Sequence, residues 1–283
     1  MLIRFTKMHG LGNDFVMLDQ VSQDIKLSPE QIKALADRHR GIGFDQLLMV
    51  EPPQDPEMDF FYRAFNADGS EAEQCGNGAR CFLRFVRDRG LTTKTCIKVQ
   101  TRNSKIECQL EKDGTITVNM GKPNLDPQRI PFLTDFPALT YKISVESSPV
   151  CKDKKVIEIS AVSMGNPHAV VQVEDVDKVP VEILGPMIEN HEKFPKRVNA
   201  GFVEIVNRNK IRLRVWERGA GETLACGTGA CAAVVSQRLL GLLDDEVEVE
   251  FKGGIAKVCW KGNDAPVYLT GPVCRVYEGR TQI

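Results

Sequence analysis

The sequence contains no apolar run that approaches the roughly 18 to 20 residues needed to cross a bilayer. Residues 1–7 (MLIRFTK) are also too short for the apolar core of a secretory signal. The 283 residues carry a formal net charge of only −1, which gives no electrostatic footprint for nucleic acid or an anionic membrane. We therefore expect a cytoplasmic protein whose partner is neither nucleic acid nor a membrane.

The cysteine pattern of a disulfide framework or a zinc knuckle is missing as well. Nine cysteines is an odd count in a long chain without an export signal, so we expect reduced thiols. Cys75 and Cys81 are six residues apart and Cys226 and Cys231 five apart, and neither interval is a CxxC knuckle. Zinc is therefore a weak alternative, and we expect no metal.

The length and the pattern of short segments favour a mixed α/β protein of two domains. Hydrophobic residues make up 42% and charged residues 27%, as in a soluble globule rather than a disordered chain. Ser28 as N-cap and Pro29 at the first helical position predict an early helix that buries Ile32, Leu35 and Ala36. Proline-rich residues 122–137 are the best linker candidate. Ten segments have strand composition: 58–65, 96–101, 105–110, 115–120, 156–162, 169–173, 202–206, 211–216, 247–251 and 255–260.

The motif Cys-Gly-X-Gly-Ala occurs twice, at Cys75 and at Cys226, 151 residues apart. At the same offset Glu71 matches Glu222, and upstream, at an offset of 153, a Gly-Asn pair at 12–13 resembles one at 165–166. Such self-similarity indicates an internal duplication. Two like domains can face each other across a pseudo-two-fold axis, so we expect the two cysteine loops to meet at one cleft.

Each repeated cysteine stands at the expected start of a helix. Gly90 and Gly241 are natural helix stops, and the apolar spacing predicts helices over about 78–89 and 229–240. Free backbone N–H groups and the positive end of the helix dipole favour a bound carboxylate or phosphate there. The same position is expected to lower the pKa of a thiol toward neutrality.

The other cysteines have an ordinary structural interpretation, as small core residues. We expect packing roles for Cys81 and Cys231 inside the helices, and for five cysteines in or beside apolar strand runs: Cys96, Cys108, Cys151, Cys259 and Cys274. A purely structural origin of both glycine-rich turns, with incidental cysteines, also stays open. The glycine-rich loops match neither standard phosphate-binding motif.

Two equivalent acid–base groups facing each other suit the inversion of a carbon centre. One group removes a proton from one face while the other delivers a proton to the opposite face. Thiols fit this task because a pKa near 8.5 can be brought close to working pH. Both helix N-termini would stabilise the charge that builds on the substrate carboxylate.

At these residues the chain resembles the diaminopimelate epimerase family over nearly its whole length. The resemblance implies epimerisation of LL- to meso-diaminopimelate without a cofactor. It implies two pseudo-symmetric α/β domains from the duplication, each a curved, mostly antiparallel sheet around a central helix: residues 1–125 with a returning strand at 272–283, and residues 126–271. The matching stretches are MHGLGNDF (8–15), GFDQLL (43–48), FNADGSEAEQCGNGARC (65–81), MGNPHAV (164–170), VNAGFVEI (198–205) and WERGAGETLACGTGACA (216–232).

The resemblance also assigns roles to individual residues. Cys75 and Cys226 would be the catalytic pair, Glu217 would bind the reacting ammonium group, and His168 would lie near a thiol. Asparagine after glycine often serves only a turn, and a histidine beside proline is often only packed. Ala200-Gly201 departs from the expected pattern and puts the local strand in doubt. The remaining residues that would hold the substrate are Asn13, Gln46, Asn66, Gly76, Asn77, Asn166, Asn199, Arg218, Gly227 and Thr228.

Two alternatives remain at this level. A proline racemase type of two-thiol enzyme would not need Arg218 or the two Gly-Asn motifs. A regulatory thiol switch joining Cys75 to Cys226 would need oxidation, whereas an epimerase needs free thiols, so turnover under strong reductant separates the two. A homodimer is also left open.

Overall fold

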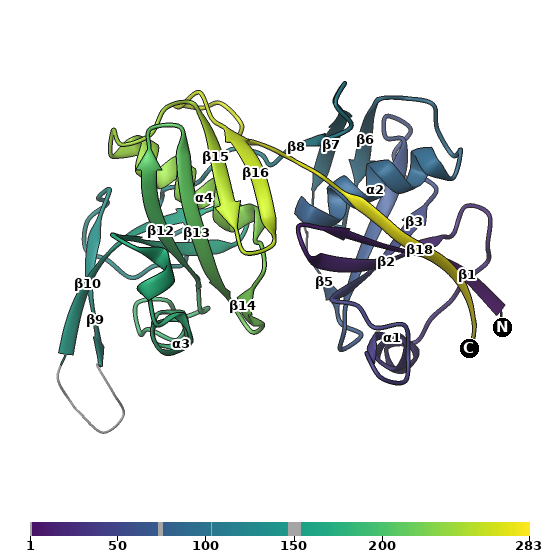
Figure 1. The fold of residues 1–283 in the computed structure, drawn as a ribbon, viewed down its shortest axis with the longest axis horizontal. Coiled ribbons are helices and arrows are strands. Elements are labelled where there is room, and N and C mark those ends of the chain that lie inside the picture. The colour runs from purple at the N-terminus through teal and green to yellow at the C-terminus, as the bar shows by residue number, and fades with distance from the viewer. Residues whose placement is uncertain (1, 73–75, 103, 147–153) are drawn as a thin grey trace. The chain divides into compact units, whose positions relative to one another are not determined.

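The computed structural model describes residues 2–72, 76–102, 104–146 and 154–283, which form two compact units. Residues 1–119 and 270–283 make the first unit, and residues 120–269 make the second. Among the described residues there are four α-helices and one short 3-10 helix, and most of the remaining ordered chain is in strands. The expected mixed α/β class is confirmed (Figure 1).

The strands of the first unit form mainly antiparallel pairs. β1–β2, β3–β4, β4–β5, β6–β7, β7–β8 and β1–β18 are antiparallel, whereas β2–β3 and β4–β6 are parallel. The bounds are β1 (Leu2–Gly10), β2 (Asn13–Asp19), β3 (Gln46–Glu51), β4 (Phe60–Asn66), β5 (Glu71–Ala72), β6 (Cys96–Gln100), β7 (Lys105–Leu110), β8 (Ile116–Asn119) and β18 (Cys274–Gln282), with helices α1 (Pro29–Ala36) and α2 (Gly76–Asp88).

The second unit repeats the same order of pairings. β10–β11, β12–β13, β13–β14 and β15–β16 are antiparallel, β11–β12 and β13–β15 are parallel, and β9 adds to β10. The bounds are β9 (Tyr141–Glu146), β10 (Lys154–Ser163), β11 (Pro167–Val173), β12 (Asn199–Asn207), β13 (Lys210–Glu217), β14 (Gly221–Thr223), β15 (Glu246–Phe251) and β16 (Gly254–Cys259), with η1 (Val176–Lys178), α3 (Val181–Glu189) and α4 (Gly227–Leu239); β17 (Tyr268–Gly271) crosses from the second unit to the first.

The two helices that follow the repeated motifs are buried within their units. α2 contacts β1, β2, β3, β7 and β8, and α4 contacts β10, β11, β12 and β16. From Gly229 to Gln237 every residue of α4 is buried. A helix that is small and apolar on all sides can lie inside a curved sheet in this way. Both helices begin two residues earlier than the sequence predicted, so the glycine after each cysteine is already helical.

The expected helix at 29–36 is confirmed, with a capping box between Ser28 and Gln31. All ten expected strand segments overlap strands, and 105–110 matches β7 at both ends. The proposed linker contains turns, but Ile130 and Phe132 are buried in the apolar core of the second unit. Residues 122–137 are therefore part of that unit's packing.

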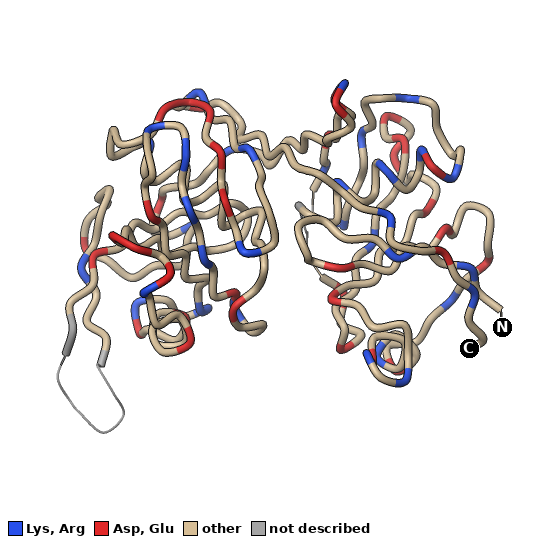
Figure 2. Tube along the Cα trace, viewed as in Figure 1, with Lys and Arg blue, Asp and Glu red and all other residues tan. Residues whose placement is uncertain are grey.

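Lys and Arg residues are interspersed with Asp and Glu residues along the chain of each unit (Figure 2). In the described part of the chain, no helix has the length and hydrophobicity of a membrane span. The doubt about Ala200-Gly201 is resolved by β12, which runs through both residues. A Cβ atom at Gly201 would meet its nearest neighbour, Leu213 Cδ1, at an ordinary 3.7 Å.

Candidate active site in two half-sites

Cys226 is the N-cap residue of α4, and two residues separate it from the short strand β14. Its side chain is buried, and Sγ lies 3.6 Å from Thr228 Oγ1. Gly229 makes this packing possible, since a Cβ atom there would lie 3.3 Å from Cys226 Sγ and 3.2 Å from Val215 Cγ2. The expected position of the thiol at a helix N-terminus is therefore confirmed for the second copy of the motif.

The expected lowering of the pKa is wrong for Cys226. Burial raises the pKa of the thiol well above its usual range, and the carboxylate of Glu217 raises it further. The Thr228 side chain and the Gly229 backbone N–H group act in the opposite direction but do not outweigh burial. Cys226 therefore keeps its proton in the ligand-free protein.

His168, Asn166 and Asn199 lie close to one another at one end of β11 and β12. His168 and Asn199 are in register across the parallel strands. Nε2 of His168 is 3.1 Å from Asn166 Oδ1, and Asn199 Nδ2 donates to the Pro167 carbonyl at 2.9 Å. Burial, then the positive charge of Arg218, lowers the pKa of His168 to about 3. Its Nδ1 atom is buried without a hydrogen-bond partner among the described residues.

The candidate residues of the second unit form one half-site, and its charged residues, Glu217 and Arg218, lie at the end of β13. The backbone N–H of Arg218 donates to Asn199 Oδ1 at 2.9 Å, and its guanidinium donates to the Lys196 carbonyl at 3.1 Å. Among the described contacts the guanidinium has no carboxylate partner. Thr223 Oγ1 donates to Glu217 Oε1 at 2.5 Å. Thr223 was not among the expected site residues, because a threonine in a strand of three residues carries no signal of its own.

The first unit brings Asn13 together with Asn77. Asn77 Nδ2 is 3.5 Å from Asn13 Oδ1, and Asn13 Nδ2 donates to Asp45 Oδ2 at 2.9 Å. Beneath them Arg80, which is fully buried, donates from Nη2 to Asn77 Oδ1 at 2.6 Å. Asn77 is thus oriented from the helix side. A buried arginine one turn into α2 could not be distinguished from a surface arginine in the sequence.

Gln46 and Asn66 lie opposite each other on β3 and β4. Gln46 Nε2 donates to Asn66 Oδ1 at 3.0 Å, and Asn66 Nδ2 donates to Ser70 Oγ at 3.1 Å. Gln46 Oε1 is buried without a partner among the described residues and can accept a further hydrogen bond. Cys75, the first catalytic candidate, lies outside the described residues.

The expectation for the remaining cysteines is partly wrong. Cys81, Cys108 and Cys231 are buried, as expected. Cys96 and Cys274 are exposed and Cys259 is half-buried. The alternation of β6 and β16 turns Cys96 and Cys259 outward, and Cys274 begins a strand, β18, whose first five residues are all exposed. Cys151 lies outside the described residues.

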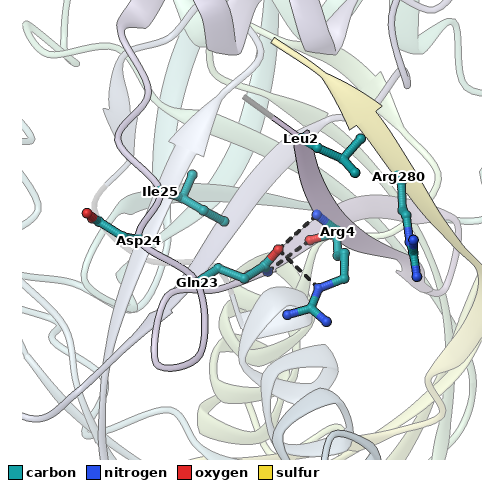
Figure 3. Close-up of a pocket in the computed structure, with 6 residues that line it drawn as sticks. All are labelled: Leu2, Arg4, Gln23, Asp24, Ile25 and Arg280. Carbon is teal, nitrogen blue, oxygen red and sulfur yellow. Dashed lines mark hydrogen bonds between the residues drawn. The ribbon is translucent and has the colours of Figure 1, made fainter.

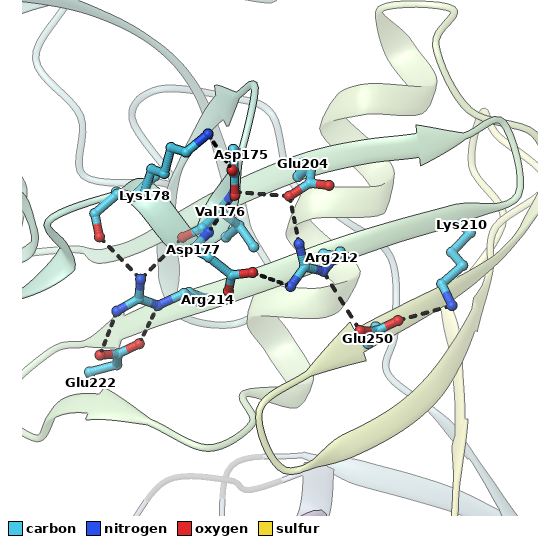
Figure 4. Close-up of polar contacts among 11 residues, drawn as sticks. Asp175, Val176, Asp177, Lys178, Glu204, Lys210, Arg212, Arg214, Glu222 and Glu250 are labelled. Atoms are coloured by element: carbon cyan, nitrogen blue, oxygen red, sulfur yellow. Dashed lines mark hydrogen bonds and ion pairs between the residues drawn. The ribbon is translucent and has the colours of Figure 1, made fainter.

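Two further features of the units involve charged side chains. A cavity of about 390 Å³ between β1, β18 and residues 23–25 is lined by Arg4 and Arg280 (Figure 3). It lies at the start of β1, whereas Asn13 follows the other end of that strand. A network of ion pairs covers the outer face of β12, β13 and β15 (Figure 4). Within the described residues no three His, Cys, Asp or Glu side chains are grouped as metal ligands would be.

Comparison with known proteins gives one consistent family. The sequence profile described as diaminopimelate epimerase matches residues 5–125 and 160–276. The chain is 54% identical over all 283 residues to proteins named diaminopimelate epimerase from Ectopseudomonas mendocina and Azotobacter vinelandii, with 100% of each chain covered.

Solved structures show the same fold at low identity. A hydroxyproline epimerase from Agrobacterium vitis with bound trans-4-hydroxy-L-proline gives a TM-score of 0.71 at 14% identity, covering 99% of this chain and 92% of that one. A phenazine biosynthesis protein of the PhzF family from Bacillus anthracis gives 0.69 at 17% identity, with both chains fully covered.

The pKa of His168 predicts a loss of stability in acid. Because the folded-state pKa of about 3 lies below the ordinary histidine pKa of 6.5, the unfolded chain binds a proton below about pH 6.5 that the folded chain does not. The free energy of unfolding should therefore fall by about 2 kcal/mol from this residue between pH 7 and pH 5. His168→Gln should lack that part of the loss.

Both tryptophans, Trp216 and Trp260, belong to the second unit, so their fluorescence during urea unfolding reports on it. Val206→Ala, at an exposed position of the same unit, changes no titratable group; it is the control and should keep the wild-type pH dependence. Equal losses in wild type and His168→Gln would contradict the assignment of a neutral His168.

Proposed function

The chain belongs to the diaminopimelate epimerase family, and from that premise we propose that it interconverts LL- and meso-diaminopimelate with Cys75 and Cys226 as its two acid–base groups. Its activity is that of an amino acid epimerase of lysine biosynthesis. In the proposed mechanism one thiolate takes the α-proton from one face and the other thiol protonates the opposite face. The reverse reaction exchanges these roles, and no cofactor takes part.

The observation that carries this proposal is the placement of Cys226. The thiol is buried at the first turn of α4, with Glu217 beside it and Thr228 in contact. In a site closed to water, the proton that a thiolate takes from the substrate does not exchange with solvent. The helix N-terminus also favours negative charge that develops nearby. Gly227 and Thr228, with Gly76 and Asn77 in the first unit, are proposed to bind the reacting carboxylate.

The polar side chains divide by charge in a way that suits a diamino dicarboxylic acid. Arg218 is a half-buried cation without a carboxylate partner among the described residues, so we assign it the distal carboxylate of the substrate. The asparagines offer both donors and acceptors to an ammonium and a carboxylate: Asn13, Asn66, Asn166 and Asn199. Gln46 offers its unpaired Oε1 atom.

Glu217 links substrate binding to the acidity of Cys226. Its negative charge is one reason why the pKa of this thiol is raised in the ligand-free protein. A substrate ammonium bound to Glu217 would offset that charge, and the pKa of Cys226 would fall toward working pH. The thiol therefore becomes a competent base when a substrate is present.

The repeated order of strand pairings supports the duplication proposed from the sequence. In each unit an antiparallel pair is followed by a parallel pair, a hairpin and a second parallel pair around one helix. We propose that the two units are the two epimerase domains. We therefore propose domain bounds that follow the two compact units, residues 1–119 with 270–283 and residues 120–269.

We also propose that the protein is a homodimer that associates through β18. This strand pairs with β1, and it exposes Val276 and Tyr277 at 52% and 45%. Leu2, on the adjoining strand, is 62% exposed. An exposed strand with apolar side chains is a typical surface for pairing with another chain.

Purified protein should therefore have the mass of two chains in light scattering after size-exclusion chromatography. Tyr277→Lys should shift it toward one chain, and Val206→Lys, at an exposed apolar position of β12, should not. A wild-type protein of one-chain mass at micromolar concentration would rule out the dimer.

The proposed function is tested by incubating the purified protein with LL-diaminopimelate under reductant, without pyridoxal phosphate or metal, followed by chiral analysis. We expect the meso isomer to form at the same rate with and without EDTA. Activity that disappears on chelation and returns with metal would contradict the cofactor-free mechanism.

The two thiols are tested in the same assay. Cys75→Ser and Cys226→Ser should each lower turnover by at least about 10³-fold, because a hydroxyl is far less acidic than a thiol. Cys274→Ser, at an exposed position, is the control and should be close to wild type. Near wild-type epimerisation by Cys226→Ser would refute the two-thiol mechanism.

Arg218→Ala should raise KM for diaminopimelate by roughly 10- to 100-fold, since a charge-assisted hydrogen bond contributes about 1.5 to 3 kcal/mol. Arg208→Ala, which removes an exposed ion pair with Asp244 in the same unit, is the matched control. An unchanged KM with full activity would place Arg218 outside the site.

A further inference from the structure

A short hairpin leads into Cys226, and an ion pair fixes its outer face. β14 lies antiparallel to the end of β13, with Trp216 opposite Glu222. Arg214 forms a two-point contact with Glu222, from Nε to Oε1 at 2.6 Å and from Nη2 to Oε2 at 3.0 Å (Figure 4). Both side chains are only 14% exposed. A two-point contact of this kind fixes orientation as well as distance.

Both partners are also tied to neighbouring elements. Arg214 Nη1 donates to the carbonyls of Val176 and Val179, each at 3.1 Å. Glu222 accepts a second cation, Lys252, which follows β15 and places Nζ 2.9 Å from Oε1. The hairpin is therefore fixed to the 3-10 turn on one side and to the end of β15 on the other.

The first unit contains the same arrangement before its own cysteine motif. Arg63 on β4 contacts Glu71 on β5, with 2.8 Å between Nε and Oε1. Arg102, which follows β6, contacts the other oxygen of Glu71 at 3.3 Å. Arg63 and Glu71 match Arg214 and Glu222 at the offset of 151 residues. The carboxylate with its two cations is thus a duplicated feature.

On the inner face the hairpin carries Thr223, the residue after Glu222. Side chains of adjacent strand residues point to opposite faces, so the outer ion pair and the inner hydroxyl lie on the two sides of one short strand. Thr223 Oγ1 holds Glu217 Oε1 at 2.5 Å, and the Glu217 carboxylate acts on the thiol of Cys226. A continuous set of contacts connects Arg214 to Cys226.

We propose that Arg214, Glu222 and Thr223 are positioning residues of the epimerase: the ion pair fixes the hairpin, and Thr223 holds Glu217 in place beside Cys226. Arg63 and Glu71 are proposed to fix the corresponding hairpin of the first unit. This inference rests on the proposed function for its effect on catalysis. Its effect on Cys226 can be measured without any substrate.

The neighbouring ion pairs provide a matched comparison on the same strand. Arg212 precedes Arg214 by two residues and points to the same outer face, where it contacts Glu204 at 3.1 Å. Glu204 is 19% exposed, close to the 14% of Glu222, but it lies on β12 and not on the hairpin. Glu204→Gln should therefore remove a similar interaction without moving Thr223.

The kinetic test compares Glu222→Gln and Thr223→Val with Glu204→Gln and Thr223→Ser. We expect Glu222→Gln and Thr223→Val to lower kcat by roughly 10- to 100-fold, with KM changed less than about threefold, because small displacements of a reacting group have effects of this size. Thr223→Ser keeps the hydroxyl and should retain most of the wild-type kcat. Glu204→Gln should match wild type, and Glu71→Gln should lower kcat as Glu222→Gln does.

The second readout is the pH dependence of Cys226 alkylation by iodoacetamide, followed by mass spectrometry of its peptide. When Glu217 is no longer held beside the thiol, the midpoint of alkylation should move to lower pH in Glu222→Gln and Thr223→Val. Thr223→Ser and Glu204→Gln should keep the wild-type midpoint. A loss of stability alone would reduce the folded fraction and leave the midpoint of the folded protein unchanged.

Wild-type kcat and midpoint in both Glu222→Gln and Thr223→Val would overturn the inference. Equal losses in Glu222→Gln and Glu204→Gln with unchanged midpoints would also overturn it, since the ion pair would then be a general stabiliser. A wild-type protein that does not epimerise diaminopimelate, while the midpoint of Glu222→Gln still moves, would reject the proposed function and support the positioning of Cys226.

Discussion

The burial of a thiol at the first turn of α4 is the constraint on which the second half-site depends. A water-excluded position makes a thiolate costly, as the raised pKa of Cys226 shows. The helix N-terminus and Thr228 act against burial, and Glu217 acts with it. The same constraint explains the small residues of α4. They let the helix lie inside the sheet, and Gly229 lets its first turn contact the Cys226 sulfur.

The two units share one order of strand pairings and differ in the side chains at the positions proposed to bind the substrate. At the offset of 151 residues Asn66 stands where the second unit has Glu217, and Arg80 stands where it has Cys231. The first unit orients neutral amides with a buried arginine and a glutamine. The second unit orients the carboxylate of Glu217 with a threonine, the backbone of Arg218 with an asparagine, and its guanidinium with the Lys196 carbonyl. Since strand pairings are alike in both, the difference lies in the side chains and not in the backbone.

Features set by local sequence could be predicted, and features set by tertiary contacts could not. The N-cap at Ser28 and the helices after the repeated motifs depend on nearby residues, and the sequence indicated them correctly. Helix α3 contains Gly185 and Pro186, which signal a break, yet Gly185 lets the helix approach the ring of Trp216. β5 and β14 are too short to show an alternation. The sign of the Cys226 pKa shift was wrong because burial depends on the whole fold.

An epimerase that uses two thiols needs them to differ in protonation at the same moment, and identical surroundings would work against that difference. The substitution of Glu217 for Asn66 supplies such a difference in the ligand-free protein, because a fixed carboxylate helps to hold the proton on Cys226 until a substrate ammonium binds to it. The difference is useful only if the carboxylate cannot turn away from the sulfur. The backbone hydrogen bonds of β14, a strand of three residues, are too few to hold the Glu217 carboxylate in place. The Arg214–Glu222 ion pair on the outer face and Thr223 on the inner face are therefore the contacts that keep this carboxylate beside Cys226.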